Sequence, residues 1–513
     1  MDNVIHAFTL VASFETVLAL VFGTLWGIVV GALPGLGSVL AITICLPFTY
    51  TMHQVPAIAM LLAIYGGSVY GGMISAILIN TPGTPQSAAT CFDGYPMSQR
   101  GEADKALGWS TIASIIGGLL SCIVLIFAAP QLAAFALQFG PIETFALILL
   151  GLTCIASISR GSMFKGLLAG VLGLFMAMVG ADPITGDLRF TFGSFELSGG
   201  FSLIPVVVGI FALSEVFDRI AQKNVDTFKA IAVSGIKLPT WTEYRPRIWV
   251  TIKSFLIGTG VGILPGTGAA TAAFLSYAEA KRSSPRRDNM GHGEPDGLVA
   301  SEASNNAVTG GALIPTLALG IPGDAVTAVM LATLTIHGIT PGVRLMHDNP
   351  DVVYASFLTL ILANLCLLPF GYIVCKLFAR ILKVPEQLML AMIVIFCLLG
   401  AYGVRSSFFD LWVALAMGML GMALRYMNVS LAALVIGLVL GPQFEMSLRQ
   451  GLVVTDGRFS GFFTGHPIAM VLFCVTILMI CWPLIRRFIG KGKPKPEMKS
   501  CAEALTVGVE EQS

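Results

Sequence analysis

Apolar stretches recur from one end of the chain to the other, separated by short polar connections. A helix that crosses the roughly 30 Å hydrocarbon core of a bilayer needs about 20 mostly apolar residues. Some stretches reach that length, and shorter ones are typical of half-helices or re-entrant hairpins. The pattern predicts an all-α polytopic membrane protein with about 12 transmembrane helices. The stretches lie at residues 14–33, 36–50, 55–80, 107–130, 141–156, 163–180, 201–218, 248–276, 307–336, 352–379, 387–404, 408–424, 428–441 and 466–485.

Composition agrees with a membrane location. Of the 513 residues, 55% are hydrophobic and 12% are charged, whereas soluble domains carry about 25% charged residues. The mean hydropathy is +0.83. A formal net charge of +1 gives no basis for nucleic-acid binding. The high hydrophobic content makes membrane lipid the expected surrounding. The sequence has no CxxC, HExxH or GxxxxGK[ST] motif, which argues against an enzyme or a nucleotide cofactor.

Proline and glycine interrupt two of the apolar stretches at similar motifs. Residues 31–38 read GALPGLGS, and residues 262–269 read GILPGTGA. Such steps interrupt a helix, and they persist in a membrane only where protein or a water-filled cavity satisfies the freed backbone groups. A matched pair of broken segments is typical of the substrate site of a secondary transporter.

A second pair of motifs follows the first in the same order. Residues 65–85 run from YGGS through a glycine pair to NTPGTP, and residues 304–324 run from SNN through a glycine pair to GIPGD. From glycine pair to Pro-Gly step, the two spacings agree to within one residue. Chance similarity is the alternative, but the shared order of two motifs favours two repeated halves with Pro-Gly-broken helices or re-entrant hairpins.

Basic residues orient the chain, because Lys and Arg concentrate in cytoplasmic loops. Residues 1–14 contain neither and are expected in the periplasm. The stretch 248–276 lies between two basic connections, so it must enter the membrane and return, turning at residues 265–268. The first break would start from the opposite side, which suggests an inverted repeat. The basic positions are Lys223, Lys229, Lys237, Arg245, Arg247, Lys253, Lys281, Arg282, Arg286, Arg287, Arg486, Arg487, Lys491, Lys493 and Lys495.

These observations divide the chain into four parts. Residues 1–220 are predicted to form the first transmembrane repeat, and residues 248–485 the second. Residues 221–247 form a cytoplasmic linker between them. Residues 486–513 are a polar cytoplasmic tail that is expected to be disordered.

The residues at the breaks are the candidates for substrate and ion binding. A break exposes N–H groups where one half-helix starts, which suit a carboxylate, and carbonyl oxygens where the other ends, which suit Na⁺. Close helix packing is the plainer explanation for a glycine, and we prefer it for isolated glycines but not for the Pro-Gly steps. The candidates are Pro34, Gly35, Gly37, Ser38, Asn80, Thr81, Pro82, Gly83, Thr84, Pro265, Gly266, Thr267, Gly268, Asn305, Asn306, Pro322, Gly323 and Asp324.

Asp324 follows directly after a Pro-Gly step. An ionised carboxylate at the centre of a membrane helix costs about 2.5–3.5 kcal/mol and normally has a partner. Asp324 can coordinate Na⁺, carry a proton or cap the following half-helix, and the sequence leaves these roles open. Glu302 is a weaker candidate. Glu215 and Arg425 lie near the ends of apolar stretches and are expected at the membrane interface.

Together the motifs resemble the large membrane (permease) subunit of the tripartite tricarboxylate transporter family, of the TctA type. The matches are densest at residues 27–110 and 255–345, and they include DGYPM at 93–97 and EASNN at 302–306. From about residue 385 only the hydrophobic pattern agrees. The resemblance implies a permease of the bacterial inner membrane that works with a periplasmic solute-binding protein and a separate small membrane subunit. It also implies uptake of a citrate-like di- or tricarboxylate, driven by an ion gradient.

Charge arithmetic favours symport over a passive pore. Moving one elementary charge through 100 mV is worth about 2.3 kcal/mol, so importing a citrate trianion into a negative interior costs about 7 kcal/mol. Accumulation therefore needs co-transported cations that at least match the charge of the anion. We expect secondary active uptake with Na⁺ or H⁺ as coupling cation and no other cofactor. A passive carboxylate channel or exporter is the alternative, and it would need neither an ion gradient nor a binding protein.

Overall fold

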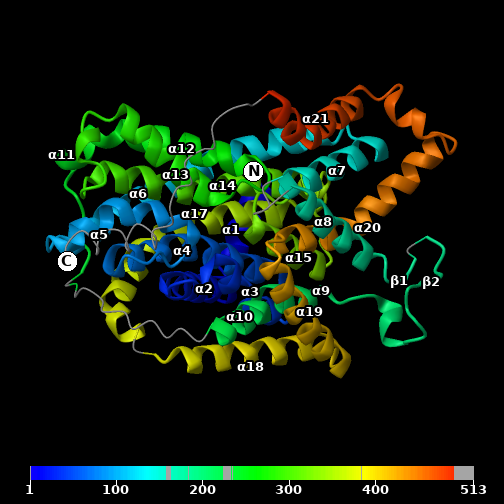
Figure 1. Cartoon of the computed structure of the whole chain (residues 1–513), viewed down its shortest axis with the longest axis horizontal. Coiled ribbons are helices and arrows are strands. Elements are labelled where there is room, and N and C mark those ends of the chain that lie inside the picture. Colours follow the sequence, from blue (N-terminus) through cyan, green and yellow to red (C-terminus); the bar gives the residue numbers. More distant parts are fainter. Residues whose placement is uncertain are drawn as a thin grey trace.

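A computed structural model of the chain describes residues 2–157, 163–182, 184–222, 233, 235–382 and 384–489. The predicted tail falls outside these residues from position 490 onward, as do residues 223–232 and 234 of the predicted linker. Helices dominate the fold (Figure 1). The described part contains one small antiparallel sheet, in which β1 (Gly180–Ala181) pairs with β2 (Leu188–Arg189).

The helical elements, in chain order, are α1 (Asp2–Val11), α2 (Phe14–Ala32), α3 (Gly37–Thr49), α4 (Gln54–Ile79), η1 (Pro85–Thr90), α5 (Cys91–Gln99), α6 (Ala103–Ala136), α7 (Pro141–Ser157), α8 (Met163–Ala177), η2 (Glu196–Gly199), α9 (Leu203–Val207), η3 (Val208–Leu213), α10 (Ser214–Gln222), α11 (Trp241–Tyr244), η4 (Arg245–Arg247), α12 (Ile248–Ile263), α13 (Gly268–Ser283), η5 (Arg287–Asn289), α14 (Pro295–Leu319), α15 (Ala325–Ile336), α16 (Leu345–Asp348), α17 (Pro350–Ile381), α18 (Glu386–Arg405), α19 (Phe408–Tyr426), α20 (Leu431–Val454), η6 (Phe459–Phe463) and α21 (Pro467–Ile489).

The described residues contain 7 helices that are long and apolar enough to cross a membrane. They are α2, α4, α6, α17, α18, α19 and α20, and further apolar helices such as α3 and α15 are shorter. Large apolar side chains are exposed on outer helices such as α18, for example at Ile395 and Leu399, as expected where lipid replaces water. The chain is therefore a helical, multi-pass membrane protein, while the number of about 12 crossings stays a prediction.

Each Pro-Gly step of the first motif pair forms the tip of a helical hairpin. The Trp26 indole in α2 donates a hydrogen bond of 3.1 Å to the Ala41 carbonyl in α3, so these helices fold back on each other. Likewise, the Lys253 amine in α12 lies 3.0 Å from the Ser283 hydroxyl at the end of α13. The predicted turn at residues 265–268 is thereby confirmed.

The two hairpin tips share one backbone conformation. Gly35 and Gly37 have φ values of +76° and +74°, and Gly266 and Gly268 have +84° and +72°. Only glycine adopts such angles without strain. The same arrangement of glycines therefore produces the same tip in both parts of the chain.

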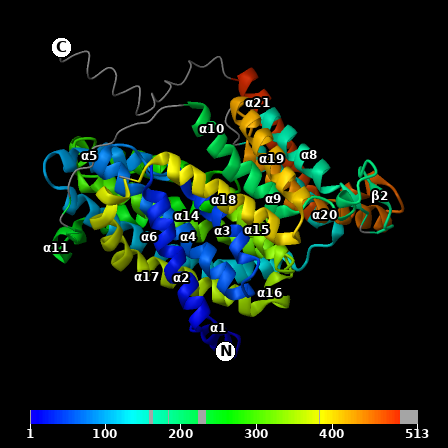
Figure 2. The ribbon, with the colours of Figure 1, turned by 90° about the horizontal axis from the view of Figure 1, so that it is seen from below.

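Glycine also lets the central helices approach closely. A Cβ atom on Gly27 or Gly31 of α2 would lie 2.6 or 2.3 Å from a carbonyl oxygen of α4. On Gly258 of α12 it would lie 2.2 Å from the Ser304 carbonyl of α14. Small residues at such crossings are typical of membrane helices, where van der Waals packing drives association. As a result, α4 and α14 are almost wholly buried and run through the interior of the protein (Figures 1 and 2).

We expect Gly31→Ala to destabilise the protein by about 1–3 kcal/mol, because the added methyl group would push α2 away from α4. The matched control is Gly66→Ala in α4, since nothing lies within 4 Å of a Cβ atom built there. The thermal unfolding midpoint in detergent should fall for the first variant and stay equal or rise for the second. Equal midpoints would contradict the packing described for Gly31.

Candidate functional site

The two hairpin tips meet at a cavity of about 750 Å³. The start of α3 and the start of α13 line it, together with the first turn of α15 and the first turn of α20. Further walls come from η1, α10 and the segment that joins α19 to α20. Helices α3, α15, α10, α19 and α20 gather in this region in Figure 1. A cavity of this size is in the range of pockets for small molecules, about 300–1,000 Å³.

Six of the predicted site residues line this cavity, and they come from both hairpins and from the start of α15. The structure therefore brings together parts of the chain that the sequence suggested only as separate motifs. The six are Gly35, Gly37, Ser38, Gly266, Gly268 and Asp324.

Apart from α10, which continues directly from η3, four helices of eight or more residues begin at the cavity: α3, α13, α15 and α20. Side chains cap two of them, because Asp324 accepts from the first turn of α15 and Ser430 from the first turn of α20. Among the described side chains, none caps α3 or α13. The first N–H groups of a helix carry partial positive charge and have no partner within the helix. Two equivalent helix starts thus offer N–H donors to one space.

Asp324 caps a helix and also faces the cavity. One of its oxygens accepts from the Thr327 N–H at 2.8 Å and from the Thr327 hydroxyl at 3.0 Å. The other accepts a 2.5 Å hydrogen bond from the Tyr65 hydroxyl, which belongs to α4. Of the roles that the sequence left open, the cap is thus realised in the structure. In the described part of the chain, no three His, Cys, Asp or Glu side chains gather as a metal site. A cation at Asp324 would therefore need hydroxyl or backbone oxygens as its other ligands.

The remaining predicted residues at the hairpin tips hold the broken backbone in place. The Gly266 N–H donates to the Gly323 carbonyl at 2.7 Å, which joins the hairpin tip to the Pro322-Gly323 step. In the same tip, which contains Pro265, the Thr267 hydroxyl donates to the Val261 carbonyl at 2.5 Å. In the first hairpin, the Arg219 guanidinium donates to the Pro34 carbonyl at 3.1 Å. These contacts satisfy carbonyl groups that the breaks release.

Residues 80–84 were predicted to bind ligand, but the structure does not bring them to the cavity wall. Asn80 adopts a left-handed conformation that ends α4, and the Thr81 hydroxyl donates to the Ile79 carbonyl at 3.3 Å. Gly83, next to Pro82, packs so tightly that a Cβ atom would lie 1.9 Å from the Gly31 carbonyl. Thr84 is buried. This break therefore packs against α2 and α4, behind the cavity.

Asn305 and Asn306 are fully buried in α14, one layer behind the wall. The Asn305 amide donates to the Gln86 carbonyl at 3.3 Å, and Gln86 itself lines the cavity. The Asn306 amide donates to Asn305 at 2.8 Å and to the Glu302 carbonyl at 3.1 Å. The two asparagines thus support the wall and connect it to the interior.

A charged cluster on the cavity wall was missed. Glu215 and Arg425, which the sequence placed near the ends of apolar stretches, both line the cavity and form an ion pair. Glu215 also pairs with Arg219 at 3.0 Å, and Asp218 lies on the same wall. The sequence did hold one signal, since residues 215, 218 and 219 have the spacing of one helix face. Nothing in the sequence linked that face to Arg425.

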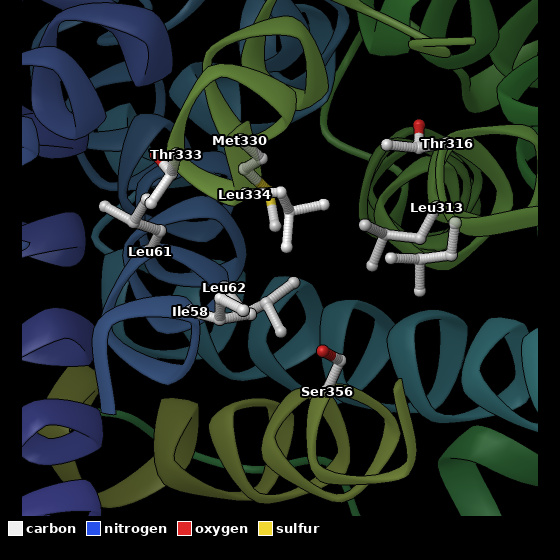
Figure 3. A pocket seen from close by; sticks show the side chains of 10 residues that line it. Ile58, Leu61, Leu62, Leu313, Thr316, Met330, Thr333, Leu334 and Ser356 are labelled. Carbon is white, nitrogen blue, oxygen red and sulfur yellow. The ribbon is translucent and has the colours of Figure 1, made fainter. Parts of the chain in front are cut away.

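A second, much smaller space lies between α4, α14, α15 and α17 (Figure 3). It measures about 10 Å³, and its lining is mostly apolar, including Ile58, Leu313 and Leu334. That volume is close to the space for one water molecule, which needs about 10–15 Å³. The space is too small for a carboxylate substrate. The large cavity is the candidate site because six of the predicted residues line it.

The arrangement of broken helices around the cavity is typical of one class of membrane protein. Broken helices and hairpin tips around a cavity of a helical membrane protein are characteristic of secondary transporters. The sequence model of the family described as "Tripartite tricarboxylate transporter TctA family" matches residues 17–436. The chain belongs to this family, as its motifs predicted. It is thus a membrane component of a tripartite transporter, in a family of transporters rather than enzymes.

Two proteins from Agrobacterium vitis are similar to this chain, and their names refer to a neighbouring gene region. One, "Uncharacterized 52.8 kDa protein in TAR-I ttuC' 3'region", is 35% identical over 478 residues, which is 92% of this chain and 95% of that protein. The other, "Uncharacterized protein in TAR-II ttuC' 3'region", is 32% identical over 45% of this chain and 96% of its own length. No solved structure matches the chain.

We expect a membrane-impermeant maleimide to label Ala270→Cys, because Ala270 lines the cavity at the start of α13. The background for this test is a variant whose 10 native cysteines are replaced. The control is Ala318→Cys, at a fully buried position of α14. Labelling from each side of the membrane would also show to which side the cavity opens. Equal reaction at both positions would contradict the cavity.

Proposed function

We propose that the protein takes up a citrate-like di- or tricarboxylate by cation symport, with the substrate bound in the large cavity. The observation that carries this proposal is the pair of uncapped helix starts, α3 and α13, which face one cavity from opposite parts of the chain. Carboxylate oxygens accept hydrogen bonds from such N–H groups, and the helix dipoles favour negative charge there. Two separate anion-binding ends suit a molecule with two or three carboxylates.

Arg425 offers a guanidinium group at this site, where it is paired with Glu215. Its side chain is 31% exposed and points its guanidinium at Glu215. Arginine binds carboxylates through two parallel hydrogen bonds, so it can exchange Glu215 for a substrate carboxylate of the same chemistry. The Ser38 hydroxyl, which belongs to the same lining, is a further donor.

Na⁺ or H⁺ is proposed as the coupling cation, with Asp324 as a ligand at the cavity. The carboxyl of Asp324 lies beside the proposed anion site and is held by uncharged donors. A cation there would offset the charge of the substrate, which the inward transport of an anion requires. The alternative is a passive carboxylate channel or exporter.

The partners and orientation follow from the family and the charge distribution. We propose a periplasmic solute-binding protein and a small membrane subunit as partners, in the bacterial inner membrane. The C-terminus is proposed to be cytoplasmic, because basic residues concentrate there and are absent from residues 1–14. The predicted division into two inverted repeats belongs to the same proposal.

The proposal is tested by uptake into proteoliposomes that contain the protein and its small subunit. Labelled citrate, succinate and malate are supplied under separate Na⁺ and H⁺ gradients, with and without the binding protein. Uptake that needs both a cation gradient and the binding protein is the expected result. Flux that ignores both gradients would support the channel instead, and uptake of none of the three acids would overturn the proposal.

Arg425→Gln is expected to raise the KM for uptake by roughly 10- to 100-fold, because a charged hydrogen bond to a carboxylate contributes about 1.5–3 kcal/mol. The control is Arg458→Gln, which removes the charge of an exposed arginine outside the cavity lining. The measurement is the concentration dependence of the initial uptake rate. An unchanged KM in Arg425→Gln would remove this residue from the site.

A further inference from the structure

Glu302 is a fully buried carboxyl in the interior of the protein. It lies on α14, and two hydroxyl groups from the first part of the chain donate to it. The Ser114 hydroxyl of α6 donates to one oxygen at 3.2 Å, and the Thr90 hydroxyl of η1 donates to the other. The Thr90 hydroxyl also lies 3.2 Å from the Ser301 hydroxyl. Oxygen atoms therefore surround this carboxyl on several sides.

No positive charge balances Glu302 in the described part of the chain. Its partners there are uncharged, and no Lys, Arg or His forms an ion pair with it. The titratable group of a packed helix that interacts with it is Tyr70 of α4, whose hydroxyl is hydrogen-bonded to Thr111. A buried ionised carboxylate without a counter-charge costs several kcal/mol. The site thus favours any state in which a cation neutralises the carboxyl.

A line of polar groups connects Glu302 to the cavity. Asn306 contacts the Glu302 carbonyl and Asn305, Asn305 donates to the Gln86 carbonyl, and the Gln86 amide lies 3.4 Å from the Ser38 hydroxyl. Among the described residues, the side-chain oxygens of Asn306 and Gln86 are buried acceptors without a hydrogen-bond partner. Buried acceptors of this kind normally have a donor or a cation. Two of them therefore mark the line as a route or resting place for a cation.

We infer that Glu302 is a binding site for a coupling cation, separate from Asp324. The inference rests on the proposed function and adds a second cation site to it. Charge balance favours a second cation site. A di- or trianion needs two or three cations, whereas Asp324 provides a single carboxyl to bind one. The ligand is a monovalent cation, H⁺ on the carboxyl or Na⁺ among the oxygens of Glu302, Thr90, Ser114 and Ser301.

The test compares wild type with Glu302→Gln, which keeps the shape of the side chain and removes its charge. Proteoliposomes with the small subunit and binding protein receive labelled citrate, succinate and malate. The membrane potential is clamped at zero, and a tenfold inward gradient of either Na⁺ or H⁺ is imposed. At steady state each coupled cation then contributes a factor of about ten, equal to about 1.4 kcal/mol, to the accumulation ratio.

The accumulation ratio of Glu302→Gln is expected to fall by tenfold or more under the gradient of the cation that Glu302 binds. The gradient that produces the fall identifies that cation as Na⁺ or H⁺. A slower but normally coupled variant would reach the same ratio as wild type, because stoichiometry and not rate sets the steady state. An unchanged ratio under both gradients overturns the inference, whereas a wild type that accumulates none of the acids overturns the proposed function itself.

Two further variants distinguish the loss of cation binding from a loss of folding. Glu143→Gln neutralises another buried carboxyl, which pairs with His466 at 2.8 Å in a different region, and its ratio should match wild type. Ser114→Ala keeps Glu302 and removes one hydroxyl from it. It should raise the half-saturating Na⁺ concentration severalfold or, for proton binding, move the pH of half-maximal uptake upward. If Glu302→Gln does not fold, the absence of either shift in Ser114→Ala overturns the inference.

Discussion

A helix that is interrupted inside a membrane leaves backbone N–H and carbonyl groups that no solvent satisfies, and this constraint shapes the whole structure. Several of the groups released at the hairpin tips have a hydrogen-bond partner. The Gly266 N–H reaches the Gly323 carbonyl, the Thr267 hydroxyl reaches Val261, and Arg219 reaches Pro34. The donors that remain, at the starts of α3 and α13, face the cavity. The unsatisfied part of the backbone thereby becomes the part that is available to a ligand.

Much of this could be predicted from the sequence, because backbone requirements are local. Positive φ values at Gly35, Gly37, Gly266 and Gly268 follow from glycine beside proline, so the hairpin tips were visible as motifs. The same signature at residues 80–84 packs between helices and does not line the cavity. A glycine that makes room for a ligand and one that makes room for a neighbouring helix look identical in sequence, and Gly83 is of the second kind.

The cavity wall on α10 and α19 could not be predicted, because it depends on tertiary packing. Glu215 and Arg425 meet only when helices far apart in the chain lie side by side, and each residue alone looks like an interfacial charge. Burial was equally hard to foresee for Glu302, since its position just before an apolar stretch does not reveal which neighbours surround it. Asp324 and Glu302 lie in the second part of the chain, and Glu215 lies on α10. The hydroxyls of Tyr65, Thr90 and Ser114 in the first part donate to carboxyls of the second part. In the other direction, the Tyr277 hydroxyl of the second part donates to Asp93 of the first part.

The contacts between the breaks have a mechanical consequence. In the second part of the chain, the hairpin tip at Gly266 is bonded to the Pro-Gly step at Gly323, and in the first part Gly83 lies directly on Gly31. Neither pair can separate without exposing backbone groups in a dry interior. These contacts favour movement of the two breaks of a pair together over their separation. The sliding surfaces have to lie elsewhere, where side chains rather than backbone atoms meet.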